Sequence, residues 1–391
     1  MNKTLLALAT LGTFACVAHA QSSVTMYGII DEGINVNSNV GGKHLYSMAS
    51  GVMQGSRFGL RGAEDLGGGL KAIFTLENGF DVNNGKLGQG GLLFGRQAYV
   101  GLRSSQFGTI TLGRQYDSIA DYVGQFEVAS QWGGNVSAHP GDLDNFNNTY
   151  RNNNTIKFAS ADYSGLKVGA TYSIGGVAGN FSQNQIWSLG AGYNNGPLAL
   201  GVAYLNARTP SNAGGLFGNS TSTSTAAAVT TPVYSGFVNA NSYQVIGAGG
   251  AYTLGAATLG VTYSNISFRN LGANGATIYR HGGNASFNNV EANFKYQFTP
   301  ALLAGAAFDY TDGGDVTLAN GTNQKGSKYF QYSMGVDYFL SKLTDVYVLG
   351  VYQHASGIGS TGKAAVAAMN TQSASGNCNQ LLARIGIRHK F

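Results

Sequence analysis

The sequence predicts an all-β fold, a transmembrane antiparallel β-barrel of 16 strands. One observation is the composition, because the 391 residues include only 23 Lys and Arg and 18 Asp and Glu, together with 59 Gly, 22 Tyr and 20 Phe. Water-soluble globular proteins carry about a quarter charged residues. The other two observations are a period-two alternation of apolar and polar residues and an alternation of short turns with long polar loops. We therefore expect much of the outer surface to face lipid.

Residues 1–20 have the pattern of a secretory signal peptide. A cationic start that includes Lys3 precedes an apolar stretch at 5–18, and Ala18-His19-Ala20 is a small-x-small cleavage site. The apolar stretch is shorter than the roughly 18–20 residues that a membrane-spanning helix needs. We expect cleavage before Gln21, and residues 21–391 to form one domain.

Each predicted strand has one apolar and one polar face. In the first strand, Val24 and Met26 alternate with Thr25 and Tyr27, and the same alternation recurs at 70–77, 155–158, 166–174, 290–298 and 330–338. A half-exposed sheet of a soluble protein shows this alternation as well. The connections between strands must therefore decide between the two kinds of sheet.

The connections favour a barrel of the outer-membrane type. Seven short turns are expected at 64–69, 104–108, 160–165, 194–197, 253–256, 299–301 and 340–342. Eight long loops are expected at 35–55, 78–91, 116–153, 175–184, 207–240, 269–284, 312–326 and 355–379. This pattern gives 16 strands with both termini on the short-turn side, which is the asymmetry of barrels with short periplasmic turns and long external loops. A closed barrel also pairs every backbone amide and carbonyl within lipid.

Basic residues on the polar phase of the strands predict a wet lumen. Arg57 and Arg61 alternate with Phe58 and Leu60, so both arginines point inward when the apolar pair meets lipid. An arginine on the lipid face near the midplane costs about 2–4 kcal/mol. The same inward phase is shared by Lys71, Lys157, Lys167, Lys295, Arg384 and Arg388. We expect these polar residues and the many inward glycines to keep the bore wide.

Two further arginines do not follow the strand phase. Arg96 and Arg114 share parity with the apolar residues of their strands, and each lies in a Gly-Arg-Gln triplet. A bulge or a strand end turns such a side chain inward. The alternative is an arginine at a strand end that faces lipid headgroups.

The longest predicted loop, 116–153, carries several carboxylates. Asp117, Asp121, Glu127, Asp142 and Asp144 are opposed there by Arg151 alone. If the loop folds inward, its carboxylates face the arginines of the wall and produce a transverse field across a narrow opening. The alternative is a solvated external loop.

Motifs for catalysis and for cofactor or metal binding are missing from the sequence. It contains no Gly-x-Ser-x-Gly elbow, phosphate-binding loop, His-Glu-x-x-His or cysteine pair at zinc spacing. The mature histidines are interpreted as surface or loop residues: His44, His139, His281, His354 and His389. The net charge of +5 is too dispersed to indicate nucleic-acid binding. An enzyme built on a barrel, from residues brought together in space, remains an alternative.

Five blocks of the chain resemble a known family. They are QSSVTMYGIID at 21–31, GSRFGLRGAEDLGGGLK at 55–71, LFGRQAYVGL at 93–102, LGRQYD at 112–117 and GIRHKF at 386–391. These blocks are similar to the general porins of Gram-negative outer membranes, of the β-proteobacterial type. The resemblance spans the whole mature chain.

The resemblance implies a homotrimer of 16-stranded barrels in the bacterial outer membrane, in contact with lipid and lipopolysaccharide. It implies that the third external loop folds into the lumen and sets a constriction, with Arg57, Arg96 and Arg151 as an arginine cluster and Asp117, Asp121 and Glu127 as the nearest carboxylates. Arg61 and Arg114 complete the predicted basic wall. The terminal Phe391 is similar to the signal that the barrel-assembly machinery reads.

The expected function is passive diffusion of small hydrophilic solutes and ions, with a modest anion preference and without a cofactor or metal. A channel specific for one substrate class, such as sugars or dicarboxylates, is the alternative that keeps the barrel. Such a channel needs an aromatic ladder or a saturable site, and the sequence shows no obvious ladder in the lumen.

Overall fold

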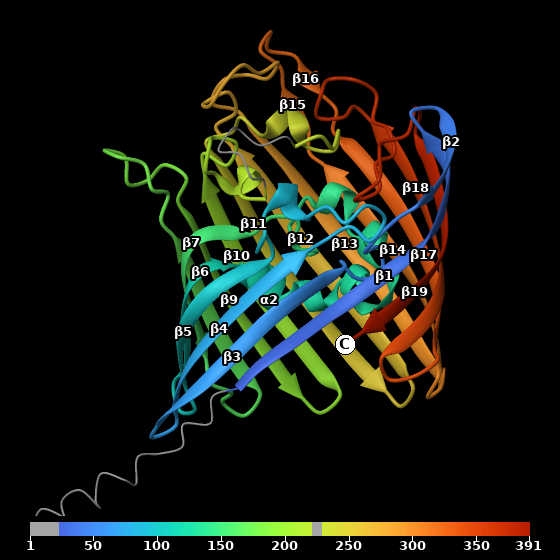
Figure 1. Ribbon diagram of the computed structural model, residues 1–391. Helices are drawn as coiled ribbons and strands as arrows, with labels where there is room; N and C mark the ends of the chain where they lie inside the picture. The colour runs from blue at the N-terminus through green and yellow to red at the C-terminus, as the bar shows by residue number, and fades with distance from the viewer. Residues whose placement is uncertain (1–22, 221–228) are drawn as a thin grey trace, which may run out of the picture.

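The chain forms a closed antiparallel barrel (Figure 1). The computed structural model describes residues 23–220 and 229–391, so the signal peptide predicted at 1–20 lies outside the described residues. Strand β1 (Ser23–Val40) pairs with β19 (Asn379–Lys390) and closes the sheet. All pairings along the wall are antiparallel, as the alternation of turns and loops predicts.

The other wall strands follow in chain order. They are β2 (Lys43–Met48), β3 (Arg57–Gly67), β4 (Leu70–Gly79), β5 (Gln97–Ser104), β6 (Gly108–Gln115), β7 (Asn152–Ser160), β8 (Leu166–Ser173), β9 (Ile186–Asn195), β10 (Leu198–Arg208), β11 (Ser242–Leu254), β12 (Ala257–Arg269), β13 (Asn284–Thr299), β14 (Leu302–Gly313), β17 (Ser327–Phe339) and β18 (Thr344–Gly357). Outside the wall lie the small hairpin of β15 (Val316–Thr317) and β16 (Asn323–Gln324) and the short helix α2 (Ser118–Tyr122). Among the described residues, no helix is long and apolar enough to cross a membrane.

The barrel has the predicted 16 wall positions. Strand β1 pairs with β3 along its first half and with β2 along its second half, so β2 and β3 share one position in the wall. Residues 49–56 interrupt this shared position and leave the wall toward the lumen, where Val52 and Met53 are buried. The 17 strands of the main sheet, counted over the described residues, therefore make 16 positions.

The prediction of a loop at 35–55 is wrong over most of this range. Strand β1 continues to Val40 and β2 begins at Lys43, with a tight Gly41-Gly42 turn between them. Ile34 and Val36 face outward and are exposed, while Asn35 and Asn37 are buried inside. Residues 35–40 resemble a loop in sequence because they are rich in asparagine. Asparagine is also compatible with the lumen face of a strand, so polarity alone did not distinguish the two.

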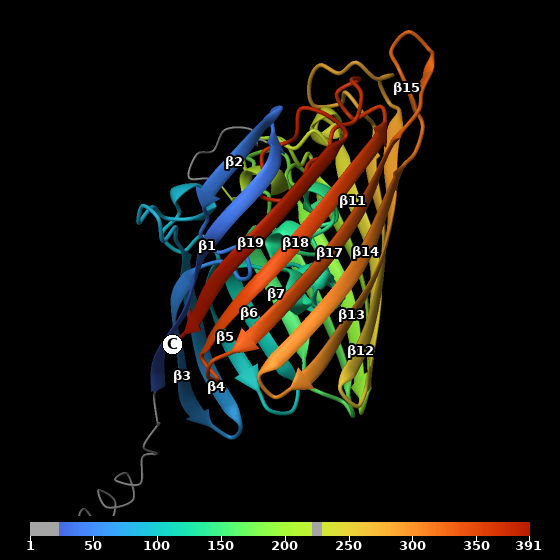
Figure 2. The same ribbon diagram turned by 90° about the vertical axis from the view of Figure 1, so that its right-hand side faces the viewer.

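The outer and inner faces of the wall differ as the alternation predicts. Apolar side chains such as Val24, Ile110 and Ile385 are exposed on the outside, while Thr111 and Gln353 on the inner face are buried. All seven short turns join the strands at the predicted places, and the tilted strands run from these turns to the long loops at the other end (Figure 2). The outer surface is therefore apolar and the interior polar.

Glycines on the inner face form a hollow that receives the segment between β6 and β7, residues 116–151, which we call the inner loop. A Cβ at Gly169, Gly190 or Gly201 would overlap Tyr122. Equivalent contacts join Gly249 to Phe126, Gly247 to Phe146, and Gly305 and Gly335 to Trp132. These glycines were expected to keep the bore wide. In the structure they have the opposite effect, because they let the aromatic rings of the inner loop pack directly on the wall.

Substitution in this hollow should loosen the inner loop. In Gly201→Val, the new side chain overlaps the Tyr122 carbonyl and crowds the Phe126 ring, so the loop must move away from β10. Overpacking of this kind costs typically 1–3 kcal/mol. We expect lower resistance to chemical unfolding in detergent and altered, noisier single-channel current.

Gly350→Val in β18 is the matched control. A Cβ at Gly350 meets no atom within 4 Å, so this variant should behave as the parent chain does. Equal unfolding midpoints and equal currents for the two variants would show that the inner loop does not depend on the glycine hollow.

Candidate functional site

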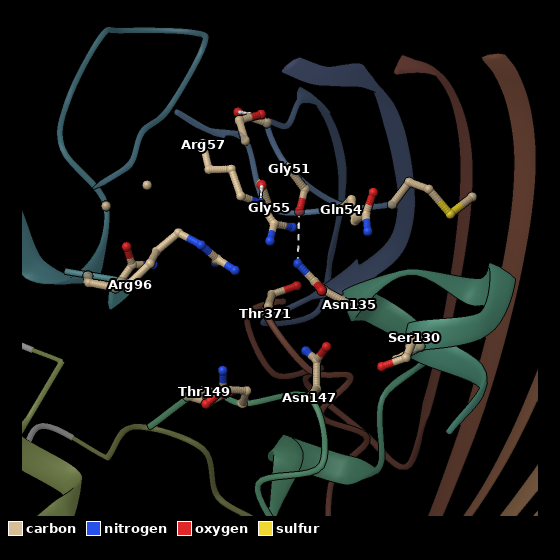
Figure 3. Close-up of a pocket in the computed structure, with 18 of the residues that line it drawn as sticks. Gly51, Gln54, Gly55, Arg57, Arg96, Ser130, Asn135, Asn147, Thr149 and Thr371 are labelled. Carbon is tan, nitrogen blue, oxygen red and sulfur yellow. Dashed lines mark hydrogen bonds between the residues drawn. The ribbon is translucent and has the colours of Figure 1, made fainter. Parts of the chain in front are cut away.

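A cavity of about 500 Å³ lies inside the barrel beside the inner loop. Its walls come from residues 49–56, the ends of β3, β4 and β19, the segment between β4 and β5, and the inner loop, with Ser220 and Thr371 from two further loops. Four arginines line it, namely Arg57, Arg96, Arg151 and Arg388. Amide and hydroxyl side chains also line it, including Gln54, Gln89, Ser130, Gln131, Asn135, Asn147, Asn148, Thr149, Ser220 and Thr371. Figure 3 shows Arg57 and Arg96 directed toward Asn135, Asn147 and Thr371 across this space.

Arg57 and Arg96 are held in place by hydrogen bonds to neighbouring groups. Arg57 Nε donates to the Gly55 carbonyl at 2.9 Å. Arg96 Nε donates to Glu77 Oε1 at 2.7 Å, and its Nη2 donates to the Tyr116 hydroxyl at 3.0 Å. Glu77 also accepts from the Tyr27 hydroxyl at 3.0 Å. Arg96 lies one residue before β5 begins. Because it is outside the strand, the alternation of inward and outward side chains along β5 did not predict the direction of its side chain.

Arg114 is turned by a bulge but does not line the cavity. The register between β6 and β7 shifts at Gly113, whose φ of 137° is a conformation that favours glycine. The Arg114 guanidinium is buried, and it donates to the Gly95 carbonyl at 2.8 Å and to Asn153. Arg114 thus ties the segment just before β5 to the start of β7.

Arg151 and Arg61 lie in different surroundings. Arg151 Nη1 donates to the Thr149 carbonyl at 3.0 Å, and its guanidinium lies 5.8 Å from the centre of the Tyr116 ring. Burial, with the nearby charge of Arg96, lowers the pKa of Arg151 to about 9, so the side chain is still charged at pH 7. Arg61 is exposed, lies over the Tyr27 ring at 5.3 Å, and is outside the cavity lining.

Arg388 is a lining residue that the sequence did not single out for the site. Its guanidinium forms a bidentate pair with Asp345, at 2.8 and 2.6 Å, and reaches Asp337 at 3.3 Å. The inward phase of Arg388 was visible in the sequence. Its place in the cavity depends on residues 49–56 turning inward, where Gln54 accepts from Arg388 Nη1 at 3.4 Å, and no sequence pattern showed that turn.

The carboxylates of the inner loop do not face the arginine cluster of Arg57, Arg96 and Arg151. Asp117 is buried, caps α2 by accepting from the Ala120 amide at 3.1 Å, and accepts from Asn145 at 2.8 Å. Asp121 pairs with Lys157 of β7. Glu127 is buried and accepts from the His139 amide at 2.8 Å.

The expected transverse field, between loop carboxylates and wall arginines, is therefore not found across this cavity within residues 23–220 and 229–391. The described residues that line the cavity include no Asp or Glu. The reason is that carboxylates inside a wall-packed loop need nearby donors, and the loop amides, Asn145 and Lys157 supply them on the side away from the cavity. The arginines therefore face neutral amides and hydroxyls.

The buried carboxylate of Asp117 should make stability depend on pH. Burial raises its pKa to about 6, above the roughly 3.9 of an unfolded chain. Between these values the folded chain binds the extra proton, so stability falls as pH rises through that window, by up to about 3 kcal/mol. In Asp117→Asn, which keeps a capping oxygen, this part of the pH dependence of the unfolding midpoint should disappear.

Asp162→Asn provides the control. Asp162 lies at an exposed turn, where the Gly165 amide lowers its pKa, so its contribution has the opposite sign and grows as pH rises. A pH slope that is unchanged in Asp117→Asn would contradict the assignment.

Comparison with known proteins agrees with this architecture. The profile of the Gram-negative porin family matches residues 5–357. An outer membrane porin protein of Bordetella pertussis is 31% identical, over 90% of this chain and 94% of its own length. Outer membrane porin protein 32 of Delftia acidovorans is 32% identical over 54% of this chain and 61% of its own.

Solved structures share the fold at lower identity. The anion-selective porin from Comamonas acidovorans superposes with a TM-score of 0.69 at 22% identity, covering 95% of this chain and all of that one. A trimer form of the outer membrane protein OmpT of Vibrio cholerae gives a TM-score of 0.61 at 17% identity, covering 95% of this chain and 99% of that one. By sequence and by fold, the chain belongs to the Gram-negative porin family, whose members are outer-membrane channels rather than enzymes.

Proposed function

We propose that this outer-membrane channel passes small hydrophilic solutes and ions by diffusion, with a modest preference for anions set by Arg57, Arg96 and Arg151. The observation that carries the proposal is the cavity lining, in which arginines face amides and hydroxyls. Permeant anions gain attraction beside the guanidinium groups, while cations are repelled. The Comamonas protein of the same fold is described as anion-selective, which agrees with this proposal.

The inner loop is proposed to form the constriction. Its aromatic rings pack in the glycine hollow, so it stays beside the arginines rather than above the barrel. The pairs of Arg96 with Glu77 and of Arg388 with Asp345 neutralise part of the positive charge, which is why the preference is modest. Arg61 and Arg114 act outside the cavity lining.

The proposal extends to assembly and partners. A homotrimer agrees with the trimer form of the Vibrio protein of the same fold. Phe391 exchanges backbone hydrogen bonds with Gly28, at 2.9 and 3.1 Å, and Leu381, Ile385 and Ile387 are exposed on the outer face of β19. This apolar terminal strand fits recognition by the barrel-assembly machinery, and the apolar outer wall fits contact with outer-membrane lipid and lipopolysaccharide. Export is proposed to use residues 1–20 as a cleaved signal peptide.

Neutralising the arginine cluster should abolish the anion preference. In the triple variant Arg57→Gln, Arg96→Gln and Arg151→Gln, we expect the reversal potential in a salt gradient to move toward zero or to the cation side while conductance is retained. The measurement is made on single channels in a planar bilayer. A parent channel that already prefers cations would overturn the proposal.

Arg280→Gln is the matched control, because Arg280 is an exposed residue of the loop between β12 and β13. It should leave the reversal potential unchanged. Block of the parent channel at low concentration by one sugar or dicarboxylate would instead indicate a substrate-specific channel.

The preference should also weaken as salt rises. Charges exposed to water are screened beyond about 8–10 Å at 0.1–0.15 M salt and beyond about 3 Å at 1 M. The permeability ratio of chloride to potassium should therefore fall toward one between 0.1 and 1 M KCl, measured from reversal potentials. A constant ratio would point to direct ligation of the ion instead of a screened field.

A further inference from the structure

A buried cluster of ionisable groups joins the inner loop to the wall, away from the cavity. His139, Glu127 and Asp144 come from the loop, Glu291 comes from β13 and Asp309 from β14. The side chains of His139, Glu127 and Glu291 have no exposed surface. One ligand atom from each of these three residues lies within 4.8 Å of the others. His139 is a loop residue, as one of the two expectations had it, but it does not lie at the surface, because its side chain is fully buried.

In each of His139, Glu127 and Glu291, one polar side-chain atom is fixed by hydrogen bonds. His139 Nδ1 lies 2.6 Å from Asp144 Oδ2, and that carboxylate also accepts from the Ser264 hydroxyl at 2.6 Å. Glu127 Oε1 accepts from the His139 amide at 2.8 Å. A carboxylate that holds one ring nitrogen of a histidine directs the other nitrogen, as in metal sites.

Glu291 is fixed in the same way. Its Oε1 accepts from the Val128 amide at 2.8 Å and from Asn293 Nδ2 at 2.7 Å. The second oxygens of Glu127 and Glu291 are buried and have no hydrogen-bond partner among the described residues. Each of the three side chains is thus held by hydrogen bonds at one polar atom, and the second oxygens of the two glutamates are left inside the buried cluster without such a bond from the part of the chain that the structure describes.

The distances around His139 Nε2 are too long for strong hydrogen bonds. Glu291 Oε2 and the Thr262 hydroxyl each lie 3.5 Å and Asp309 Oδ2 lies 3.7 Å from Nε2, whereas a charge-assisted N–H···O bond spans about 2.7–2.9 Å. Ligands bound to zinc at about 2.0–2.2 Å in a tetrahedron lie roughly 3.4 Å from one another. The spacing fits an ion between these atoms better than a shared proton.

The charge of the cluster also favours a bound cation. Four carboxylates, from Glu127, Asp144, Glu291 and Asp309, surround one imidazole. A protonated imidazole supplies one positive charge, and unpaired buried carboxylates are strongly unfavourable. A divalent cation supplies two.

We propose that Glu127, His139 Nε2 and Glu291 bind one first-row divalent cation of the zinc class, with Asp309 as the nearest further ligand and Asp144 as the group that orients the imidazole. Imidazole nitrogen with carboxylate oxygen is a donor set that suits Zn²⁺. Because two ligands come from the inner loop and one from β13, the ion fastens the loop to the wall. The site is fully buried, so the ion enters while the barrel folds.

The test is the metal content of the full mature chain folded in detergent. The chain is refolded from denaturant with Zn²⁺ or with EDTA, passed over a desalting column, and analysed by inductively coupled plasma mass spectrometry. We expect about one Zn²⁺ per chain, and less than a tenth of that in His139→Gln and in Glu127→Gln. The unfolding midpoint of the parent chain should be higher after folding with Zn²⁺ than with EDTA.

His281→Gln controls for adventitious binding by an imidazole, since His281 is exposed and distant in the chain, and it should retain the ion. Equal zinc in the parent chain and in His139→Gln, or no zinc in the parent chain, would overturn the proposal. The second outcome would mean that protons alone balance the cluster. If neither variant folds, the comparison of the parent chain with Zn²⁺ and with EDTA decides, because an unchanged midpoint and no retained ion would contradict the site.

Discussion

Closure of the sheet on itself is the constraint on which the rest of the structure depends. In lipid, every backbone amide and carbonyl needs a partner from the protein, and the pairing of β1 with β19 removes the last open edges. Once the wall is closed, its outer face is free to be apolar and its inner face to be polar. Arginines and carboxylates therefore collect inside, where they find one another or water.

The inner loop is held by shape as well as by charge. Glycines on six strands leave room for Tyr122, Phe126, Trp132 and Phe146. In a water-soluble protein such aromatic rings would pack in the hydrophobic core, whereas here they pack against the backbone of the wall. Close packing of this kind leaves little freedom for the loop to leave the lumen. The position of the loop then determines which side chains border the cavity.

Local alternation predicted much of the fold, and contacts between distant segments account for the rest. The strand count follows from the alternation of short turns and long loops, and the inward phase of Arg57 and Arg388 follows from parity. The strand segments at 35–40 and 43–48 were missed because asparagines are equally compatible with a loop and with a lumen face. Parity carried no information about residues 49–56 or about the partners of Glu291, because the contacts of Gly51 with Asn135 and of Glu291 with Val128 join parts of the chain that lie more than 80 residues apart.

The same limit explains why the carboxylates of the inner loop were assigned to the cavity. Their number in the sequence suggested a partner for the arginines, but a loop that packs on a wall has two faces with different requirements. On the wall side, carboxylates bond to backbone amides, Asn145 and Lys157, while on the cavity side uncharged amides and hydroxyls meet water. The arginines are instead held from behind by Glu77, Asp345 and backbone carbonyls. Fastening the loop and setting the charge of the cavity are therefore carried out by different residues, so one can change without the other.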